Sequence, residues 1–192
     1  MKTRLLCTAL FLFVFRLTYS QCPAAGYTCI PDANFEQALI NQNIDSEASL
    51  DGRVLTSDID TRTFLDVSNN SIADLTGIED FIALEQLNCH LNGLTVLDLS
   101  NNLNLRILLC YNNQIENTLD LTGNNALESV LCNNNKLTGL DLPNTPTNLT
   151  RVDCHFNDIT TLDVTAALNL DRLNFTQNTI PTINLTNNTK LT

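Results

Sequence analysis

The sequence lacks an apolar run long enough to cross a lipid bilayer. Its one mainly apolar stretch, Leu5 to Phe15, has about 11 residues, whereas a transmembrane helix needs about 20. Glycine and proline are also scarce, at 6 and 5 of 192 residues, while 43% of the residues are hydrophobic. This composition excludes a disordered chain and predicts one folded domain that does not span a membrane.

Basic residues are also scarce. The chain has 10 Lys and Arg against 21 Asp and Glu, which gives a formal net charge of -11. A surface of this sign repels phosphate groups, so we expect no nucleic-acid partner.

Residues 1–20 have the pattern of a secretory signal peptide. Lys2 and Arg4 precede the apolar stretch, and the small residues Thr18 and Ser20 stand three and one positions before the predicted cleavage site. Cleavage after Ser20 would remove three basic residues and no acidic one. The sequence therefore predicts an exported protein that is even more acidic when mature.

A repeat of 21 or 22 residues fills the chain over residues 62–192. Each unit has apolar residues three and five positions after an opening leucine, asparagine at eight and an aliphatic residue at ten. The opening leucines are Leu84, Leu105, Leu127, Leu149, Leu170 and Leu191. An earlier variant unit contains Leu65 and Asn70. A period this regular predicts a solenoid of six rungs plus the start of a seventh.

The alternation within each unit predicts its local structure. Apolar residues two apart predict a short strand with one side inward, and successive strands would stack as a parallel sheet. The inward asparagine amides can satisfy buried turn backbone, so they should form a ladder: Asn92, Asn113, Asn135, Asn157 and Asn178. A second alternation, such as Leu97 to Leu99, predicts a second short strand across the coil. The predicted fold class is a mainly β repeat solenoid.

The motif L-x-x-L-x-C-x-x-N-x-L-x-x-L-D-L resembles the leucine-rich repeats of secreted proteins from Bacteroidetes-type bacteria. The resemblance covers residues 62–192. It implies a leucine-rich-repeat coil with a protein-interaction role, whose ligand is read by the variable outward positions. It also implies an extracellular or cell-surface location in a Gram-negative bacterium.

Residues 21–61 are expected to form an N-terminal cap region. Residues 31–41 read as an amphipathic helix that would cover the first rung of the solenoid. Cys22 and Cys29, with six residues between them, are a candidate disulfide in an exported chain.

The segment after this helix partly matches a calcium-binding loop. The candidate ligand positions are Glu47, Ser49, Asp51, Arg53 and Asp58. Glutamate replaces the compact aspartate that opens such loops, and aspartate replaces the glutamate that closes them. A polar turn that uses the Asp-Gly pair is the favoured interpretation, so we expect no cofactor, with calcium as the alternative.

The ladder cysteines are interpreted as small core residues rather than as ligands or nucleophiles. They are Cys89, Cys110, Cys132 and Cys154. His90 and His155 follow two of them but point to the opposite face, and the two histidines are three rungs, or about 14 Å, apart. We therefore expect neither a shared metal ion nor a catalytic pair, and hence no enzyme.

An acidic column is expected on the second strands. Its members are Asp98, Asp120, Asp141 and Asp163. Like charges at one-rung spacing repel, so either cations gather there or the pKa values rise. A solvated acidic edge is the favoured interpretation.

An apolar patch is predicted on the outward side of the main strands, where polar residues are the norm. Its centre is Ile107, Leu109, Tyr111 and Leu131, with Leu91 and Phe156 nearby and with His90 and Asp153 at the edge. Exposed apolar clusters with an aromatic member commonly mark contact sites.

The sequence therefore predicts a non-catalytic extracellular module that binds a protein or glycan through its strand-bearing face. The alternative is a spacer or presentation domain of a larger secreted or surface-attached protein. The alternative follows from the ending, because Leu191 and Thr192 open a new unit without a polar cap, and we expect further domains after Thr192.

Overall fold

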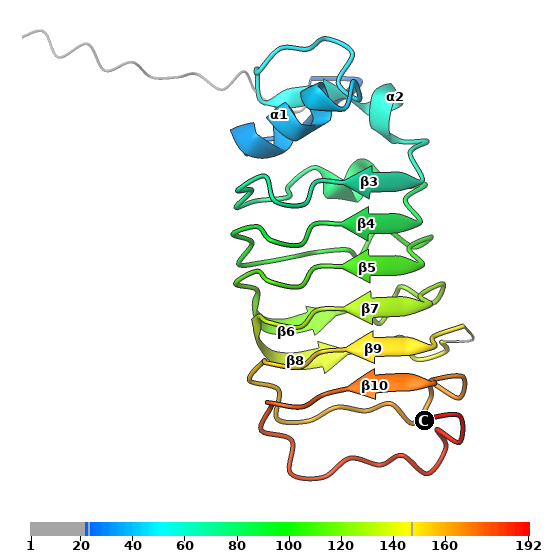
Figure 1. Ribbon diagram of the computed structural model, residues 1–192. Coiled ribbons are helices and arrows are strands. Elements are labelled where there is room, and N and C mark those ends of the chain that lie inside the picture. Colours follow the sequence, from blue (N-terminus) through cyan, green and yellow to red (C-terminus); the bar gives the residue numbers. More distant parts are fainter. Residues whose placement is uncertain (1–21, 23, 147) are drawn as a thin grey trace, which may run out of the picture.

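The computed structural model describes residues 22, 24–146 and 148–192, which form a parallel β-solenoid (Figure 1). Six short strands stack in one parallel sheet in the order β10-β9-β7-β5-β4-β3. Their bounds are β3 Phe64–Asp66, β4 Gln86–Asn88, β5 Ile107–Leu109, β7 Ser129–Leu131, β9 Arg151–Asp153 and β10 Arg172–Asn174. The predicted solenoid fold is confirmed.

Register places the same repeat position of every rung in one line. Leu87 pairs with Leu108, which pairs with Val130, and all three side chains are 0% exposed. Complete burial of one such side chain stabilises the folded state by about 1.5 to 3 kcal/mol. The core is therefore one continuous apolar column inside the coil, and the residues on either side of each inward residue face solvent.

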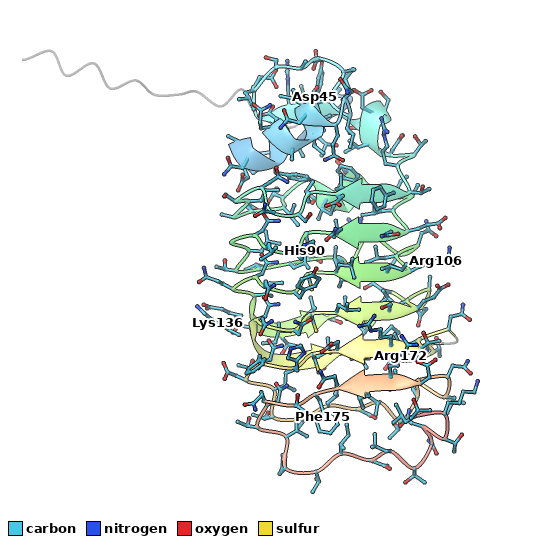
Figure 2. All side chains as sticks on the ribbon, viewed as in Figure 1. Asp45, His90, Arg106, Lys136, Arg172 and Phe175 are labelled. Atoms are coloured by element: carbon cyan, nitrogen blue, oxygen red, sulfur yellow. A yellow bond between two sulfur atoms is a disulfide. The ribbon has the colours of Figure 1, made fainter. Side chains whose placement is uncertain are left out.

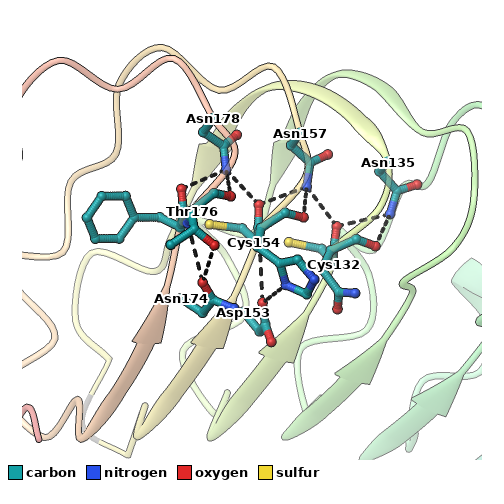
Figure 3. A network of polar contacts seen from close by, with 11 residues as sticks. Cys132, Asn135, Asp153, Cys154, Asn157, Asn174, Thr176 and Asn178 are labelled. Atoms are coloured by element: carbon teal, nitrogen blue, oxygen red, sulfur yellow. Dashed lines mark hydrogen bonds and ion pairs between the residues drawn. The ribbon is translucent and has the colours of Figure 1, made fainter.

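The asparagine ladder forms as predicted. The Nδ2 atom of Asn113 donates to the carbonyls of Cys89 and Cys110, both at 3.0 Å, and its Oδ1 atom accepts from the Leu94 N–H at 3.1 Å. The same contacts recur at Asn135, Asn157 and Asn178 (Figure 3). Each amide therefore joins two rungs through buried backbone groups that would otherwise lack partners.

A second set of buried asparagines was not predicted. They stand three residues before the next opening leucine, at Asn102, Asn124 and Asn188. The Nδ2 atom of Asn124 donates to the carbonyls of Leu99 and Asn102 at 3.1 and 3.0 Å. Phe81, Pro146 and Ala167 hold this position in other rungs. Asparagine therefore does not recur at this position in every unit, and the sequence pattern does not reveal the set. Its amides nevertheless donate to backbone carbonyls, as those of the main ladder do.

The second strand exists in only two of the five expected rungs. β6, Glu116–Asp120, pairs in parallel with β8, Lys136–Asp141, on the other side of the coil (Figure 1). In the neighbouring rungs Leu97 and Leu162 are buried as expected, but their backbone is not in a strand. The prediction is therefore wrong for these rungs, because alternation specifies which side chains are inward and not whether the backbone pairs.

A small cap covers the first rung (Figure 1). β1, Tyr27–Cys29, pairs antiparallel with β2, Arg53–Leu55, and the two helices are α1, Ala33–Asn41, and α2, Thr56–Ile59. A 3-10 helix, η1, Ile78–Asp80, follows the first strand of the main sheet.

Helix α1 begins two residues later than residues 31–41 suggested, because Asp32 is its N-cap. The Asp32 Oδ1 atom accepts the N–H groups of Asn34 and Phe35, as N-cap residues do. Its Oδ2 atom accepts the N–H groups of Ala73 and Asp74 in the first repeat, at 2.7 and 3.0 Å. One carboxylate therefore caps the helix and joins it to the solenoid.

The predicted signal peptide, residues 1–20, lies outside the described residues. Within the described part of the chain, none of the helices has the length and apolar character that a membrane crossing requires.

The ladder yields a stability prediction. Replacing Asn113 or Asn135 by alanine should lower the free energy of unfolding by about 1 to 3 kcal/mol, because buried carbonyls lose their donor. Thermal or urea unfolding measures the change. Asn101→Ala is the control, because Asn101 is exposed. Unchanged unfolding of both ladder variants would contradict the role assigned to the amides.

Candidate functional site

The strand face is defined here as the outward side chains of the six main strands and of the residues just after them. Register aligns Leu109 of β5 with Leu131 of β7, and Leu131 with Asp153 of β9. Ile107 lies beside Gln86 and Ser129 in the same way. The structure thus brings the predicted patch residues of the central rungs into contact range on one continuous surface.

The centre of the strand face is apolar and half-buried. Ile107, Leu109, Leu131 and Tyr111 all have intermediate exposure, because neighbouring rungs cover their sides. The rings of Tyr111 and His90 stack across two rungs, with centroids 4.4 Å apart and an interplanar angle of 16°. Such a stack holds the Tyr111 ring in one orientation on the half-buried surface.

Polar pairs border this centre on both sides. Asp153 contacts the Nδ1 atom of His155 at 2.5 Å, and the Nδ1 atom of His90 contacts the side-chain oxygen of Asn88 (Figure 3 shows the first pair).

Burial acts to raise the pKa of Asp66, but hydrogen bonds from Ser68 and Asn88 outweigh it and hold that pKa below its ordinary value. Asp66 is therefore a fixed negative charge at the first rung.

Two large apolar side chains project beyond the strand ends. Leu91 is 47% exposed and Phe156 is 53% exposed, and the Phe156 ring lies 5.3 Å from the ring of His155. Both belong to the predicted patch, and they stand in the second and fifth rungs. They are more accessible than the predicted centre.

Phe64 is a face residue that the sequence interpretation missed. It is 51% exposed in β3 and lies in register with Gln86, which in turn lies beside Ile107. The available signal was the alternation Phe64-Leu65-Asp66, which places Phe64 outward once Leu65 is inward. In Figure 2, Arg106 and Arg172 lie at the edge where the strands begin, and His90 lies beyond the strand ends.

The four ladder cysteines are buried and unbonded, and they point away from this surface. Burial raises the pKa of Cys89 and of Cys154 to about 12, and raises that of Cys110 and Cys132 well above its usual value. A protonated, enclosed thiol is a poor nucleophile and a poor metal ligand. The described residues also hold no group of three or more His, Cys, Asp or Glu side chains suited to a metal ion.

Candidate calcium ligands in the cap are engaged with other groups. The Asp51 carboxylate contacts the Arg53 guanidinium at 3.0 Å, and Glu47 accepts the Tyr27 hydroxyl at 3.2 Å. The Asp58 carboxylate accepts the N–H of Ser46 at 3.1 Å. Ser49 is exposed in the same loop.

A buried carboxylate organises the turn instead. The Oε1 atom of Glu36 accepts the N–H groups of Asp51, Gly52 and Arg53 at 2.8 to 3.1 Å. Burial raises the pKa of Glu36, although these three bonds oppose the shift. The loop thus folds around a side chain of helix α1, which no loop motif reveals.

Cys22 and Cys29 form a disulfide in the structure, with their Cα atoms 5.6 Å apart. Cys29 is the last residue of β1, so the bond attaches the start of the described chain to the cap.

In the acidic column, the pKa values of Asp120 and Asp163 are lowered rather than raised. Hydrogen bonds from the N–H and hydroxyl of Thr122 lower the pKa of Asp120, and those from Thr165 lower that of Asp163. These local turn contacts outweigh repulsion between exposed charges one rung apart, which water screens. Pro143 holds the equivalent position after Asp141, and proline has no N–H to donate.

Comparison with known proteins supports the repeat assignment. No family model matches the chain. Internalin J of Listeria monocytogenes serotype 4b is 55% identical over 42 residues, which are 22% of this chain and 5% of that protein. A solved functional domain of InlJ from Listeria monocytogenes, described as including a cysteine ladder, is 32% identical with a TM-score of 0.54. That alignment covers 86% of this chain and 46% of the InlJ chain.

A second solved structure shows the fold alone. The internalin InlF of Listeria monocytogenes is 23% identical with a TM-score of 0.71, over 85% of this chain and 48% of that chain. The chain thus spans about half the length of these solved relatives. Its repeats are leucine-rich repeats, and they are similar to those of internalins.

Thiol burial yields a labelling prediction. Iodoacetamide at pH 8 should leave the four ladder cysteines of the native chain unlabelled and should label all four after unfolding without reductant, as measured by intact mass. Burial excludes the reagent, and thiols with a pKa of about 12, such as Cys89, stay protonated at that pH. Labelling of the native chain at the rate of the unfolded chain would contradict the burial.

The cap yields a calcium prediction. Added calcium should leave the melting temperature unchanged, because Asp51 and Glu47 already contact protein groups. Differential scanning fluorimetry with calcium and with a chelator measures this. A calcium-dependent rise in melting temperature that Asp51→Ala abolishes would establish a binding loop instead.

Proposed function

We propose that this chain is an exported, non-catalytic binding module of a Gram-negative bacterium that recognises a protein or glycan through its strand face. The observation that carries the proposal is the apolar centre around Tyr111, which lies on the solvent side of the sheet. A solvated sheet gains nothing from aromatic and aliphatic side chains there, whereas an interface gains burial when a partner covers them.

An extracellular or cell-surface location is supported by two features. The pattern of residues 1–20 is that of a signal peptide. The bond between Cys22 and Cys29 is of a kind that forms and persists in oxidising compartments. A Bacteroidetes-type origin rests on the resemblance of the repeat motif.

A non-catalytic role is supported by the chemistry of the strand face. His155 contacts Asp153, but the described part of the face has no hydroxyl or thiol nucleophile bonded to either histidine. The strand face can therefore bind a partner by shape complementarity and by burial of its apolar side chains.

The test removes the apolar centre and leaves the core intact. Tyr111→Ala combined with Leu131→Asn should leave the melting temperature unchanged and should weaken retention of partners from a surface extract of the producing organism. Loss of a central anchor commonly costs about 2 kcal/mol or more, or roughly 30-fold in affinity.

The matched control is a variant with Asp120→Asn and Asp141→Asn, on the opposite side of the coil (Figure 1). It should retain partners as the parent does. Loss of partners by this control, with retention by the double variant, would place the binding surface on the acidic side. Retention by both variants would favour a spacer or presentation domain.

A further inference from the structure

Every described rung has a left-handed residue at the seventh position after the opening residue of the unit. The six residues are Asn69, Leu91, Asn112, Asn134, Phe156 and Gln177, with φ angles between 52° and 58°. The turn off the strand requires this conformation, because the next residue is the ladder asparagine that points inward. Position seven is therefore a backbone constraint of the repeat, independent of any ligand.

Leu91 and Phe156 do not suit this constraint. Asparagine is favoured in the left-handed region, whereas bulky apolar side chains are rare there because the Cβ atom approaches the following carbonyl oxygen too closely. Burial does not compensate, since these two side chains are 47% and 53% exposed. Residues held in a sparsely populated backbone conformation cluster at sites that contact ligands. Leu91 and Phe156 also expose apolar surface to water.

The separation of the two side chains limits the shape of a partner that touches both. The intervening rungs stay hydrogen-bonded at this position, because Leu91 donates to the Tyr111 carbonyl at 3.1 Å and Asn134 donates to the His155 carbonyl at 3.0 Å. Three rung spacings give about 14 Å. Residues four apart in an extended strand are about 13 Å apart and lie on the same face.

A helix fits this separation less well. Its residues rise about 1.5 Å each, so residues seven apart on one face span only about 10.5 Å, and residues eleven apart span about 16.5 Å. An extended segment that runs along the solenoid axis matches both the length and the facing of Leu91 and Phe156.

Charge limits the composition of the segment. The chain has a net charge of -11. Asp66 lies one rung before Leu91, and Asp153 lies in the same rung as Phe156. The lowered pKa of Asp66 keeps that carboxylate charged. Positive residues outside the two anchors would therefore be attracted to these two carboxylates.

We propose that the strand face binds an extended peptide segment with two apolar side chains four residues apart, flanked by basic residues, and that Leu91 and Phe156 receive these side chains. The proposal rests on the proposed binding role of the strand face and names the class of partner. Tyr111 lies between the two anchors and would contact the middle of the segment.

The probe is a fluorescein-labelled nonapeptide, Lys-Thr-Leu-Thr-Ser-Thr-Leu-Thr-Lys, compared with isomers whose leucines are two or six residues apart. The full chain should bind the four-residue spacing about 5-fold or more tighter than either isomer in fluorescence polarisation, since one good apolar contact is worth about 1 kcal/mol. Equal binding of the three peptides, or no binding up to millimolar concentration, would overturn the proposal.

Matched variants assign the contacts. Leu91→Asn and Phe156→Asn should each weaken the preferred peptide about 5-fold and should leave the melting temperature unchanged or raised, because asparagine suits the left-handed backbone. Leu168→Asn is the control, since Leu168 is 57% exposed in the turn before β10. Equal weakening by the control, or none by the two asparagine variants, would contradict the assignment.

The surface-extract assay separates the two proposals. If Tyr111→Ala with Leu131→Asn loses partners while the peptide shows no spacing preference, the binding role stands and the extended-peptide proposal fails. If neither that double variant nor Leu91→Asn and Phe156→Asn lose any partner, both proposals fail.

Discussion

The structure depends on one repeated contact, the inward asparagine amide that serves backbone groups of two rungs at once. Asn113 donates to carbonyls in its own and in the preceding rung and accepts an N–H from the preceding rung. The turn that carries it leaves the strand through a left-handed residue, so the chain can coil back without burying unpaired polar groups. Stacking of the strands, enclosure of the cysteines and the position of the exposed turn residues all follow from this contact.

Stability and recognition are divided between alternate residues of each short strand. In β5, Leu108 is inward and fully buried, while Ile107 and Leu109 face outward. Outward side chains can therefore vary from rung to rung at little cost to folding. Leu91 and Phe156 depart from this division. Each lies at a position where the repeat requires a left-handed backbone, which disfavours bulky side chains, and each exposes its apolar side chain to solvent.

The cap uses carboxylates where the solenoid uses amides. Asp32 caps helix α1 and also accepts two N–H groups of the first repeat, and Glu36 accepts three N–H groups of the loop before β2. Each carboxylate bridges segments that lie far apart in the sequence. The end of the apolar column is thereby covered by Phe35, whose ring stacks 6.4 Å from that of Phe81.

The amino-acid sequence by itself determined the solenoid, the inward and outward positions and the asparagine ladder, because these follow from a period of 21 or 22 residues and an alternation of two. It also indicated which apolar residues point outward, because these are the residues that alternate with the core. Only the tertiary structure decided the pairing of β6 with β8, the stacking of His90 on Tyr111 and the loop around Glu36. These features depend on distances between rungs and on backbone torsions, and a linear pattern carries information about neither.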